Sequence, residues 1–466
     1  MKMKRFINKR LIAAVTCLIM AGIFCCSCTG ANGISETSIV ESSETTVVQT
    51  VETVPPETEP TEPVMTAEDL CGMLVCDLAS SLLNHDVTAD EYSAEITGLA
   101  EGSTDIYSVV NDIVFGDEFT AQGLDNSEII SRLNTALARG TLGSITLEFL
   151  TNEADGGVTI DSIVDALTHQ VTFEEYCISY GVACDTDELV ERSDIYDNLS
   201  ALPELEEPMV LAFGGYVPGD ESITALEQVM EDFESTYRYQ YSFMLVDINT
   251  GRGITYNYDQ PFYLASSIKG PYAISLGRYD EDGVRTHVNT IINMLVNSDN
   301  DAYTSLNGRY GRTYIQQWCE ECGVNPAPCA YKYPRLGCRD MARIWTHGYE
   351  YLNGEIILED GSVAGFTNPV NPEESDEPLA VTLGSWLDHP EYSLIHSAVG
   401  EMYVTQSKGG WMVGEDSSYS STVDAGIVYS DNGPYVVVIE SNIPINFDIL
   451  MPLMLELDSI HNEITE

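Results

Sequence analysis

Residues 262–276 read FYLASSIKGPYAISL and combine features that rarely occur together. Aromatic residues lead to Ser266, and Lys269 follows three positions later at the start of an apolar run that predicts a buried helix. A lysine is costly to bury in an apolar helix unless a partner or a chemical task keeps it there. The spacing places Lys269 one helical turn from Ser266, where a lysine of lowered pKa is able to take the serine's proton.

Two later stretches add polar residues of the same kind. Ser298-Asp299-Asn300 lies 32 residues after Ser266, on a polar break between two helical runs. Lys408-Gly409-Gly410 lies on a strand-like segment near the C-terminus. Each of the three stretches also has a purely structural interpretation. Ser266 would be a helix cap, Ser298-Asp299-Asn300 a turn, and Lys408 a solvated lysine on a strand.

In this order, the three stretches resemble the S-x-x-K, S-D-N and K-T-G motifs of the serine β-lactamase and penicillin-binding protein superfamily, and class A β-lactamases in particular. The resemblance covers residues 209–466 and extends to GCRDMARIW (337–345) and STVDAGIVYSDNGPYVVVIESN (421–442). It implies an α+β, β-lactamase-like fold with a five-stranded antiparallel sheet flanked by helices. An all-helical lobe would carry the second motif, and the active site would lie between lobe and sheet.

The same resemblance implies a role for each motif residue in proton transfer. Ser266 would be the acylated nucleophile and Lys269 its proton acceptor. Ser298 would pass the proton to the leaving nitrogen of the substrate. No cofactor and no metal ion is needed for this chemistry.

The remaining roles concern substrate binding. Asn300 would hold the substrate's amide, Lys408 would supply positive charge for its carboxylate, and Gly410 would let the strand approach closely. The backbone N–H groups of Ser266 and Trp411 would form the oxyanion hole, in which one donor can be worth roughly 3–4 kcal/mol.

The sequence departs from the family pattern at two places. Gly409 stands where the family has Thr or Ser, so a hydroxyl for the substrate carboxylate is missing unless Ser407 points into the cleft. The family's deacylating glutamate is also missing, because the segment GVNPAPCAYKYPRLGC (323–338) contains no acid. Glu320 and Glu321 precede this segment in a run that predicts a helix.

These departures favour acylation followed by slow deacylation. We therefore expect a serine hydrolase that forms an acyl-enzyme at Ser266 with β-lactams or D-alanyl peptides, as penicillin-binding proteins do. Two alternatives stay open. One is a catalytically degenerate fold used for surface binding, and the other is an esterase or amidase on the same fold.

The N-terminus predicts export and anchoring to a membrane. Basic residues precede the apolar run LIAAVTCLIMAGIF (11–24), which is shorter than the roughly 18 residues of a membrane span. CCSCTG follows, and its Ser27-Cys28 pair resembles a bacterial lipoprotein cleavage site. Residues 1–28 are therefore expected to be a signal peptide whose Cys28 is lipidated, on the outer face of the cell membrane. Cys25, Cys26 or an ordinary secretory signal are the alternatives.

Composition indicates what the remaining regions of the chain are and which partners it excludes. The 466 residues include 74 acidic and 20 basic side chains, and a net charge of −54 argues against nucleic-acid binding. Residues 29–65 are rich in Thr, Glu and Pro and predict a disordered linker. Residues 66–208 predict a small helical domain with a weak repeat at a spacing of 54, in which Ile106 recurs as Ile160 and Phe119 as Phe173.

Eight cysteines follow the predicted signal peptide, an even number that allows disulfides in an oxidising compartment. Four of them cluster in the sequence: Cys319, Cys322, Cys329 and Cys338. Their uneven spacing favours disulfide staples over a zinc site, although C-x-x-C is also a metal spacing.

Overall fold

The structure is a computed structural model that describes residues 65–184, 192–366, 377–414 and 419–465. The predicted signal peptide, Cys28 and all of the predicted linker except its last residue lie outside the described residues. Their assignments remain predictions.

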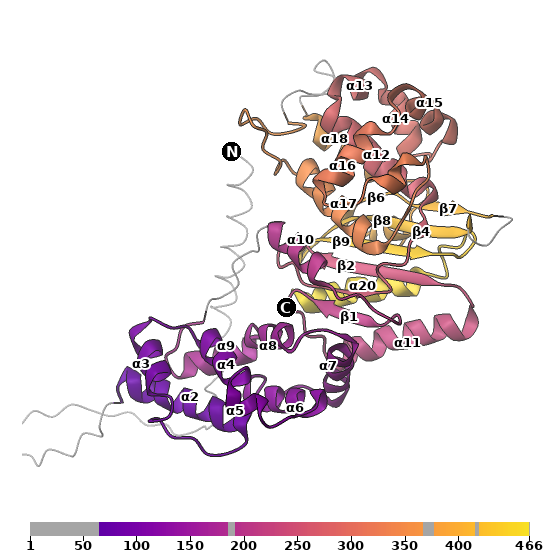
Figure 1. Cartoon of the computed structure of the whole chain (residues 1–466). Coiled ribbons are helices and arrows are strands. Elements are labelled where there is room, and N and C mark those ends of the chain that lie inside the picture. Colours follow the sequence, from indigo (N-terminus) through magenta and orange to yellow (C-terminus); the bar gives the residue numbers. More distant parts are fainter. Residues whose placement is uncertain (1–64, 185–191, 367–376, 415–418, 466) are drawn as a thin grey trace, which may run out of the picture. The chain divides into compact units, whose positions relative to one another are not determined.

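Helices occupy the region for which the sequence predicts a small helical domain (Figure 1). Thr66 and Asp125 form capping boxes with Asp69 and Glu128, which fix the start of two of these helices. The helices that begin at Ile106 and Ile160 start 54 residues apart, the spacing of the sequence repeat, and each is nine residues long. The helices are α2 (Ala67–Leu83), α3 (Ser93–Glu101), α4 (Ile106–Val114), α5 (Asp117–Thr120), α6 (Asn126–Ala136), α7 (Ser144–Gly156), α8 (Ile160–Thr168), α9 (Val171–Ser179) and α10 (Arg192–Ala201).

An antiparallel sheet follows, and it contains seven strands within the described residues instead of the five that the resemblance implies. One extra strand is β1, which pairs with β3 at the edge. The other arises because the Lys408-Gly409 segment separates β6 from β7, and both then pair with β8. The strands are β1 (Val210–Phe213), β2 (Tyr241–Asp247), β3 (Gly253–Tyr256), β6 (Val404–Ser407), β7 (Gly410–Met412), β8 (Ser421–Ser430) and β9 (Gly433–Ser441), in the order β1-β3-β2-β9-β8-β6 with β7 beside β8.

Helices cover both faces of the sheet. As a result, every residue of the central strand β2 is buried. Alternate side chains point to opposite faces of a strand. Phe243 and Leu245 therefore join the core beneath α11 (Asp220–Thr236) and α20 (Met451–Ile464), whereas Met244 and Val246 join the core beneath α17 (Cys338–Leu352).

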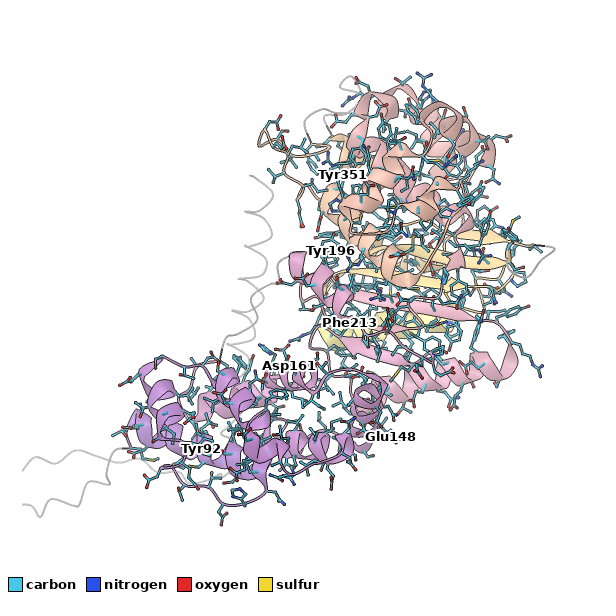
Figure 2. All side chains as sticks on the ribbon, viewed as in Figure 1. Tyr92, Glu148, Asp161, Tyr196, Phe213 and Tyr351 are labelled. Carbon is cyan, nitrogen blue, oxygen red and sulfur yellow. The ribbon has the colours of Figure 1, made fainter. Side chains whose placement is uncertain are left out.

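A group of helices beyond α17 forms the predicted helical lobe, visible around α12 to α16 in Figure 1. Phe213 and Tyr351, both labelled in Figure 2, belong to the core that joins this lobe to the sheet. The elements are η1 (Ala265–Ile268), α12 (Lys269–Tyr279), α13 (Glu281–Thr286), α14 (Val288–Leu295), α15 (Asn300–Tyr310), α16 (Thr313–Glu321), η2 (Ala327–Ala330) and α18 (Leu379–Leu387), with a small sheet of β4 (Phe262–Tyr263) and β5 (Arg335–Leu336). The short helix α19 (Leu394–Val399) packs instead on the other face of the sheet, in the core shared with α20. Within the described ranges, every helix is too short or too polar to cross a bilayer.

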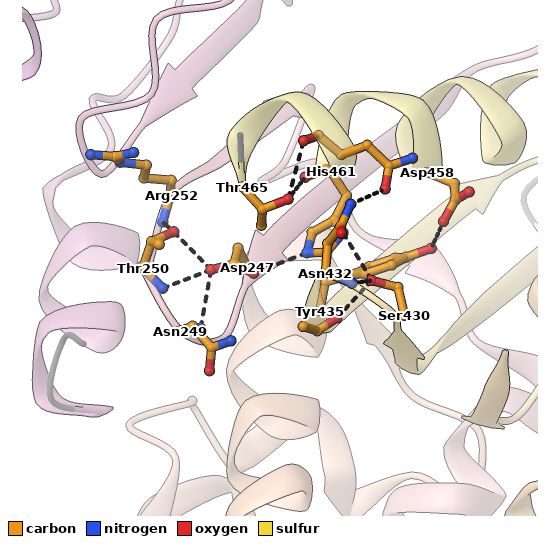
Figure 3. Close-up of polar contacts among 12 residues, drawn as sticks. Asp247, Asn249, Thr250, Arg252, Ser430, Asn432, Tyr435, Asp458, His461 and Thr465 are labelled. Carbon is orange, nitrogen blue, oxygen red and sulfur yellow. Dashed lines mark hydrogen bonds and ion pairs between the residues drawn. The ribbon is translucent and has the colours of Figure 1, made fainter. Parts of the chain in front are cut away.

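The last helix is fastened to the sheet by buried polar pairs (Figure 3). His461 Nε2 lies 2.9 Å from Asp247 Oδ2, and neither side chain is exposed. Tyr435 donates a hydrogen bond of 2.7 Å to Asp458 on the same helix. The second oxygen of Asp247 accepts from the backbone N of Thr250, so one carboxylate orders both α20 and the turn after β2.

Candidate active site

The chain enters the site through a strained turn. Leu264 N donates to Pro334 O at 3.1 Å, which follows the β4–β5 pairing and fixes the start of the turn. Ala265 then adopts a φ of +47°, a left-handed conformation that costs about 1–2 kcal/mol for a residue with a Cβ. Ser266 follows in η1, so it precedes the first turn of α12. Strain of this kind accumulates where a structure must present a particular group.

Lys269 is the first residue of α12, and its side chain has no exposed surface. Its Nζ donates to the backbone oxygen of Ser298 at 2.6 Å and to Oδ1 of Asn300 at 2.8 Å. Burial, reinforced by the nearby charge of Lys408, lowers the pKa of Lys269 to about 7, although Asp299 opposes the shift. A lysine with this pKa is a competent base at neutral pH.

The second motif sits where α14 passes into α15. Ser298 has a φ of +53°, and Asp299 caps α15 by accepting from Ala302 N at 2.6 Å. The hydroxyl of Ser298 is buried without a hydrogen-bond partner in the described structure. It is the backbone oxygen of this residue, and not the predicted hydroxyl, that contacts Lys269.

Ser266 Oγ has no hydrogen bond with Lys269 Nζ or with any other described group. Ser266 is partly exposed, in contrast to the fully buried Ser267 beside it. Catalytic hydrogen bonds are often long in unliganded sites and shorten when substrate binds. The structure therefore shows that Lys269 contacts Ser298 and Asn300, and the proton transfer from Ser266 to Lys269 stays a prediction.

The third motif brings β7 against the serine turn. A Cβ added at Gly410 would lie 2.6 Å from Ser266 N and 2.5 Å from Leu264 O, so only glycine fits without moving the backbone. Trp411 follows in β7 and packs edge-on against Tyr392 at 4.8 Å between ring centres. This close approach is what an oxyanion hole from the N–H groups of Ser266 and Trp411 requires.

Lys408 lies in the break between the two strands and is completely buried. Its N donates to Ala425 O, and its Nζ donates to Gly409 O at 2.8 Å. Burial lowers the pKa of Lys408, although the neighbouring carboxylate of Asp424 partly compensates. Burial likewise raises the pKa of Asp424. Both groups are fully buried, and the charge of each offsets part of the cost of burying the other.

The structure explains why no hydroxyl stands at position 409. A Cβ on Gly409 would lie 2.6 Å from the backbone oxygen of Tyr392, so the segment before α19 fills the space that a threonine needs. Ser407 does not replace that hydroxyl, because its Oγ is buried 2.8 Å from Ser393 Oγ. Ser393 in turn donates to Asp424.

Glu321 lies away from the serine. It accepts from Arg278 at 3.2 Å and lies 3.3 Å from His347, near the far end of α12. Arg278 is nine residues after Lys269, which corresponds to about 13 Å along a helix. Burial raises the pKa of Glu321, but the hydrogen bond to His347 and the charge of Arg278 outweigh it, so the pKa lies below its usual value.

The segment that lacks an acid supplies a tyrosine to the site, and the sequence analysis missed it. Tyr333 donates to Asn300 Oδ1 at 3.2 Å, the same atom that accepts from Lys269. The sequence signal for this role is weak. It consists of the aromatic and cationic residues Tyr331, Lys332 and Tyr333 in a loop where a carboxylate is expected.

The four clustered cysteines do not form one group. Cys319 and Cys329 face each other with their Sγ atoms 3.5 Å apart, whereas Cys338 contacts Ser242 in β2 at 3.0 Å. Cys319, Cys322, Cys329 and Cys338 are all free thiols in the structure. The disulfide expectation therefore has a suitable geometry at one pair, and Cys338 has a different partner.

Comparisons with known proteins found no matching family model and no matching curated protein. Solved structures with a similar arrangement include β-lactamases from Chitinophaga pinensis (14% identity, TM-score 0.39) and Sphaerobacter thermophilus (16%, 0.38), each over 52% of this chain and 100% and 96% of those chains. PBP-A has 15% identity and a TM-score of 0.38, over 52% of this chain and 96% of that one. This similarity concerns architecture over about half of the chain, and the chemistry must be argued from the residues.

Proposed function

We propose that the chain is a serine hydrolase that forms an acyl-enzyme at Ser266 with β-lactams or D-alanyl peptides and releases it slowly. One observation carries the proposal. A fully buried lysine, one turn after a partly exposed serine, has its pKa lowered to about 7 and contacts both Ser298 and Asn300.

Acylation would begin with neutral Lys269 accepting the proton of Ser266 Oγ as this oxygen attacks the substrate's amide carbon. The negative charge on the carbonyl oxygen would be stabilised by the N–H groups of Ser266 and Trp411. The buried hydroxyl of Ser298, which lacks a partner, would then carry the proton from Lys269 to the leaving nitrogen. Cleavage of the amide bond leaves an ester on Ser266.

Deacylation would lack a dedicated base. The segment 323–338 contains no acid, and Glu321 is engaged by Arg278 and His347 at the other end of α12. General-base assistance is typically worth about 10²–10⁴ in rate, so its absence makes the ester long-lived.

A fluorescent penicillin tests the proposal directly. We expect covalent labelling with one adduct, which mass analysis of peptides places on Ser266. Ser266→Ala abolishes the labelling, whereas the matched variant Ser267→Ala retains it, because the buried Ser267 hydroxyl has no partner to lose. Equal labelling of wild type and Ser266→Ala contradicts the assignment. Absence of labelling in a folded wild type favours the surface-binding alternative.

A specific observation also keeps the esterase or amidase alternative. Gly409 has no room for a hydroxyl-bearing side chain, and Ser407 is engaged with Ser393. Both features remove groups that would bind a substrate carboxylate. Comparison of acylation by a carboxylate-bearing penicillin and by its methyl ester separates the two functions, because a site of the alternative kind reacts equally with both.

We further propose that the chain is exported and anchored to the membrane through a lipid on Cys28. The support is the order of basic, apolar and small residues before that cysteine. Cys28→Ser is expected to move the protein from the membrane fraction to the soluble fraction. A variant that stays in the membrane fraction contradicts lipidation at Cys28.

A further inference from the structure

The segment after η2 is fastened to α15 by three hydrogen bonds. Tyr303 donates to the backbone oxygen of Lys332 at 2.8 Å, and Lys332 Nζ donates to Thr304 Oγ1 at 2.5 Å. Tyr333 then reaches back to Asn300 Oδ1 at 3.2 Å. These contacts hold Lys332 and Tyr333 against α15.

The other flank of Tyr333 is attached to the serine turn. Pro334 O accepts from Leu264 N, immediately before Ala265 and Ser266. The ring of Tyr333 packs against Tyr263 and Tyr303, at 6.1 Å and 5.5 Å between ring centres. Backbone and ring contacts thus fix the phenol, so removal of its hydroxyl leaves the ring in place.

Asn300 is oriented by two donors that meet on one atom. Its Oδ1 accepts from Lys269 Nζ and from the Tyr333 hydroxyl, which occupies both lone pairs of the amide oxygen. The amide oxygen of Asn300, and not its NH₂ group, therefore faces Lys269 and Tyr333. The amide NH₂ group has no partner among the described residues and is the end left for a ligand.

We propose that Tyr333 is a positioning residue for acylation: its hydroxyl holds the Asn300 amide with the oxygen toward Lys269 and the NH₂ group toward the substrate. This inference rests on the proposed function, since it assigns a part in the reaction at Ser266. Tyr333 lies in the loop where the family resemblance implies a deacylating glutamate. The chain therefore has a tyrosine that would support acylation in place of a carboxylate that would support deacylation.

The chemistry of the phenol supports a role as donor only. Burial raises the pKa of Tyr333 to about 12, so the hydroxyl keeps its proton at neutral pH. It is therefore able to orient an amide oxygen but unable to take a proton from water. The same residue favours the formation of the acyl-enzyme and offers no help in its hydrolysis.

A double-mutant cycle tests the inference. The second-order rate of labelling by a fluorescent penicillin is measured for the wild type, Tyr333→Phe, Asn300→Ala and the double variant. Loss of one hydrogen bond predicts a three- to tenfold slower reaction for Tyr333→Phe, in the range typical of such bonds. Because Tyr333 acts through Asn300, the second substitution should have no further effect in the Asn300→Ala background. Tyr331→Phe, on the same loop with an exposed ring, is the matched control and should react as wild type.

The pH profile supplies a second readout that a merely structural role would not change. Lys269 is faced by the charges of Lys408, Asp299 and Lys332, and these stay the same in Tyr333→Phe. Without the competing donor, Asn300 Oδ1 stabilises the Lys269 ammonium more strongly, so the rising limb of acylation should move to higher pH.

The outcomes are distinct from those that test the proposed function. If Ser266 of the wild type is not labelled, the proposed function fails. If the wild type reacts but Tyr333→Phe has the same rate and pH profile, only the role of Tyr333 is overturned. An equal loss in both Asn300 backgrounds also overturns it, since Tyr333 then acts by another route.

Discussion

At the scale of single residues, the site depends on groups that are unfavourable for folding. Lys269 is fully buried, and Ala265 before it and Ser298 after it in the sequence are held at positive φ. Each of these features costs stability, and each is retained where the serine turn, α12 and α15 meet. The most direct test of this arrangement is the protonation of Lys269.

Acylation should depend on pH through Lys269. The neutral amine is the reactive form, so the rate should rise with pH and reach half its maximum near the lysine's pKa of about 7. Lys269→Met keeps the length of the side chain and removes the base, and should slow labelling by about 10²–10⁴. Labelling rates between about pH 5.5 and 8.5 check both statements. A flat profile, or rapid labelling of Lys269→Met, contradicts the role of base.

Gly410 offers a second test at this scale. An added Cβ would contact Ser266 N and Leu264 O. Because both are backbone atoms, they cannot move aside as the end of a flexible side chain can. Gly410→Ala should therefore displace β7 from the serine turn and slow acylation by about 5- to 150-fold, as an overpacking cost of about 1–3 kcal/mol suggests. Gly308→Ala on α15, where the added methyl meets open space, is the control. Acylation of Gly410→Ala at the wild-type rate would show that β7 does not help to form the site.

At the scale of elements, the connection between α15 and α17 determines which side chains face the serine turn. It consists of α16, η2 and the segment that carries Tyr333. α16 packs on α12 with Glu321 near the helix end farthest from Lys269, and the segment after η2 faces the serine turn without an acid. In the proposed reaction, this short connection would bring no carboxylate to the ester on Ser266.

Turnover should consequently be slow. A chromogenic cephalosporin is expected to give a stoichiometric burst and little steady-state hydrolysis, with an acyl-enzyme that lasts for minutes or longer. Glu321→Gln should leave the deacylation rate unchanged, because that carboxylate is engaged by Arg278 and His347. Burst amplitude and steady-state rate, followed by stopped flow, measure both quantities. Rapid turnover that Glu321→Gln abolishes would identify Glu321 as the base.

The same connection contains a cysteine pair whose geometry suits a disulfide. Cys319 in α16 and Cys329 in η2 are buried with their sulfurs 3.5 Å apart. In an oxidising compartment we expect these two thiols to lose two protons and two electrons to a disulfide oxidant and form a bond. Alkylation and mass mapping of the exported protein should find this bond and a free Cys338, whose sulfur contacts Ser242. A disulfide that includes Cys338 contradicts the prediction.

Much of the α+β architecture follows from the sequence, because alternating strands and the apolar run after Lys269 are local patterns. The strand number does not follow, since β1 has only four residues and the strand around Lys408 is divided by its own glycines. The role of Tyr333 could not be predicted from the sequence either, because it depends on the contact with Asn300 and not on the neighbouring residues in the chain. Nor does the burial of Ser407 follow, since it arises from Ser393 on a separate segment.

At the scale of the whole molecule, charge is distributed unevenly. The chain has a net charge of −54, and beyond residue 10 it contains only three lysines: Lys269, Lys332 and Lys408. All three lie near one another, since the charges of Lys332 and Lys408 both lower the pKa of Lys269. The lysines beyond the N-terminus are thus concentrated in one part of a molecule whose net charge is strongly negative.

The helical region and the sheet are joined by a carboxyl group that should make stability depend on pH. Glu153 in α7 accepts from Ala212 N of the edge strand β1 at 2.6 Å, and burial raises its pKa to about 8. A carboxyl whose folded-state pKa exceeds its unfolded value of about 4.5 contributes stability that is complete below that value and lost as pH rises through 8. Glu153→Gln keeps the hydrogen-bond acceptor but cannot titrate. Between about pH 6 and 9 the melting temperature of the wild type should therefore decrease by a few degrees more than that of Glu153→Gln. The difference between the two proteins isolates Glu153, because the depressed pKa of Lys269 has an effect of opposite sign that is common to both. Identical pH dependence of the two melting temperatures would show that Glu153 is not protonated in the folded protein.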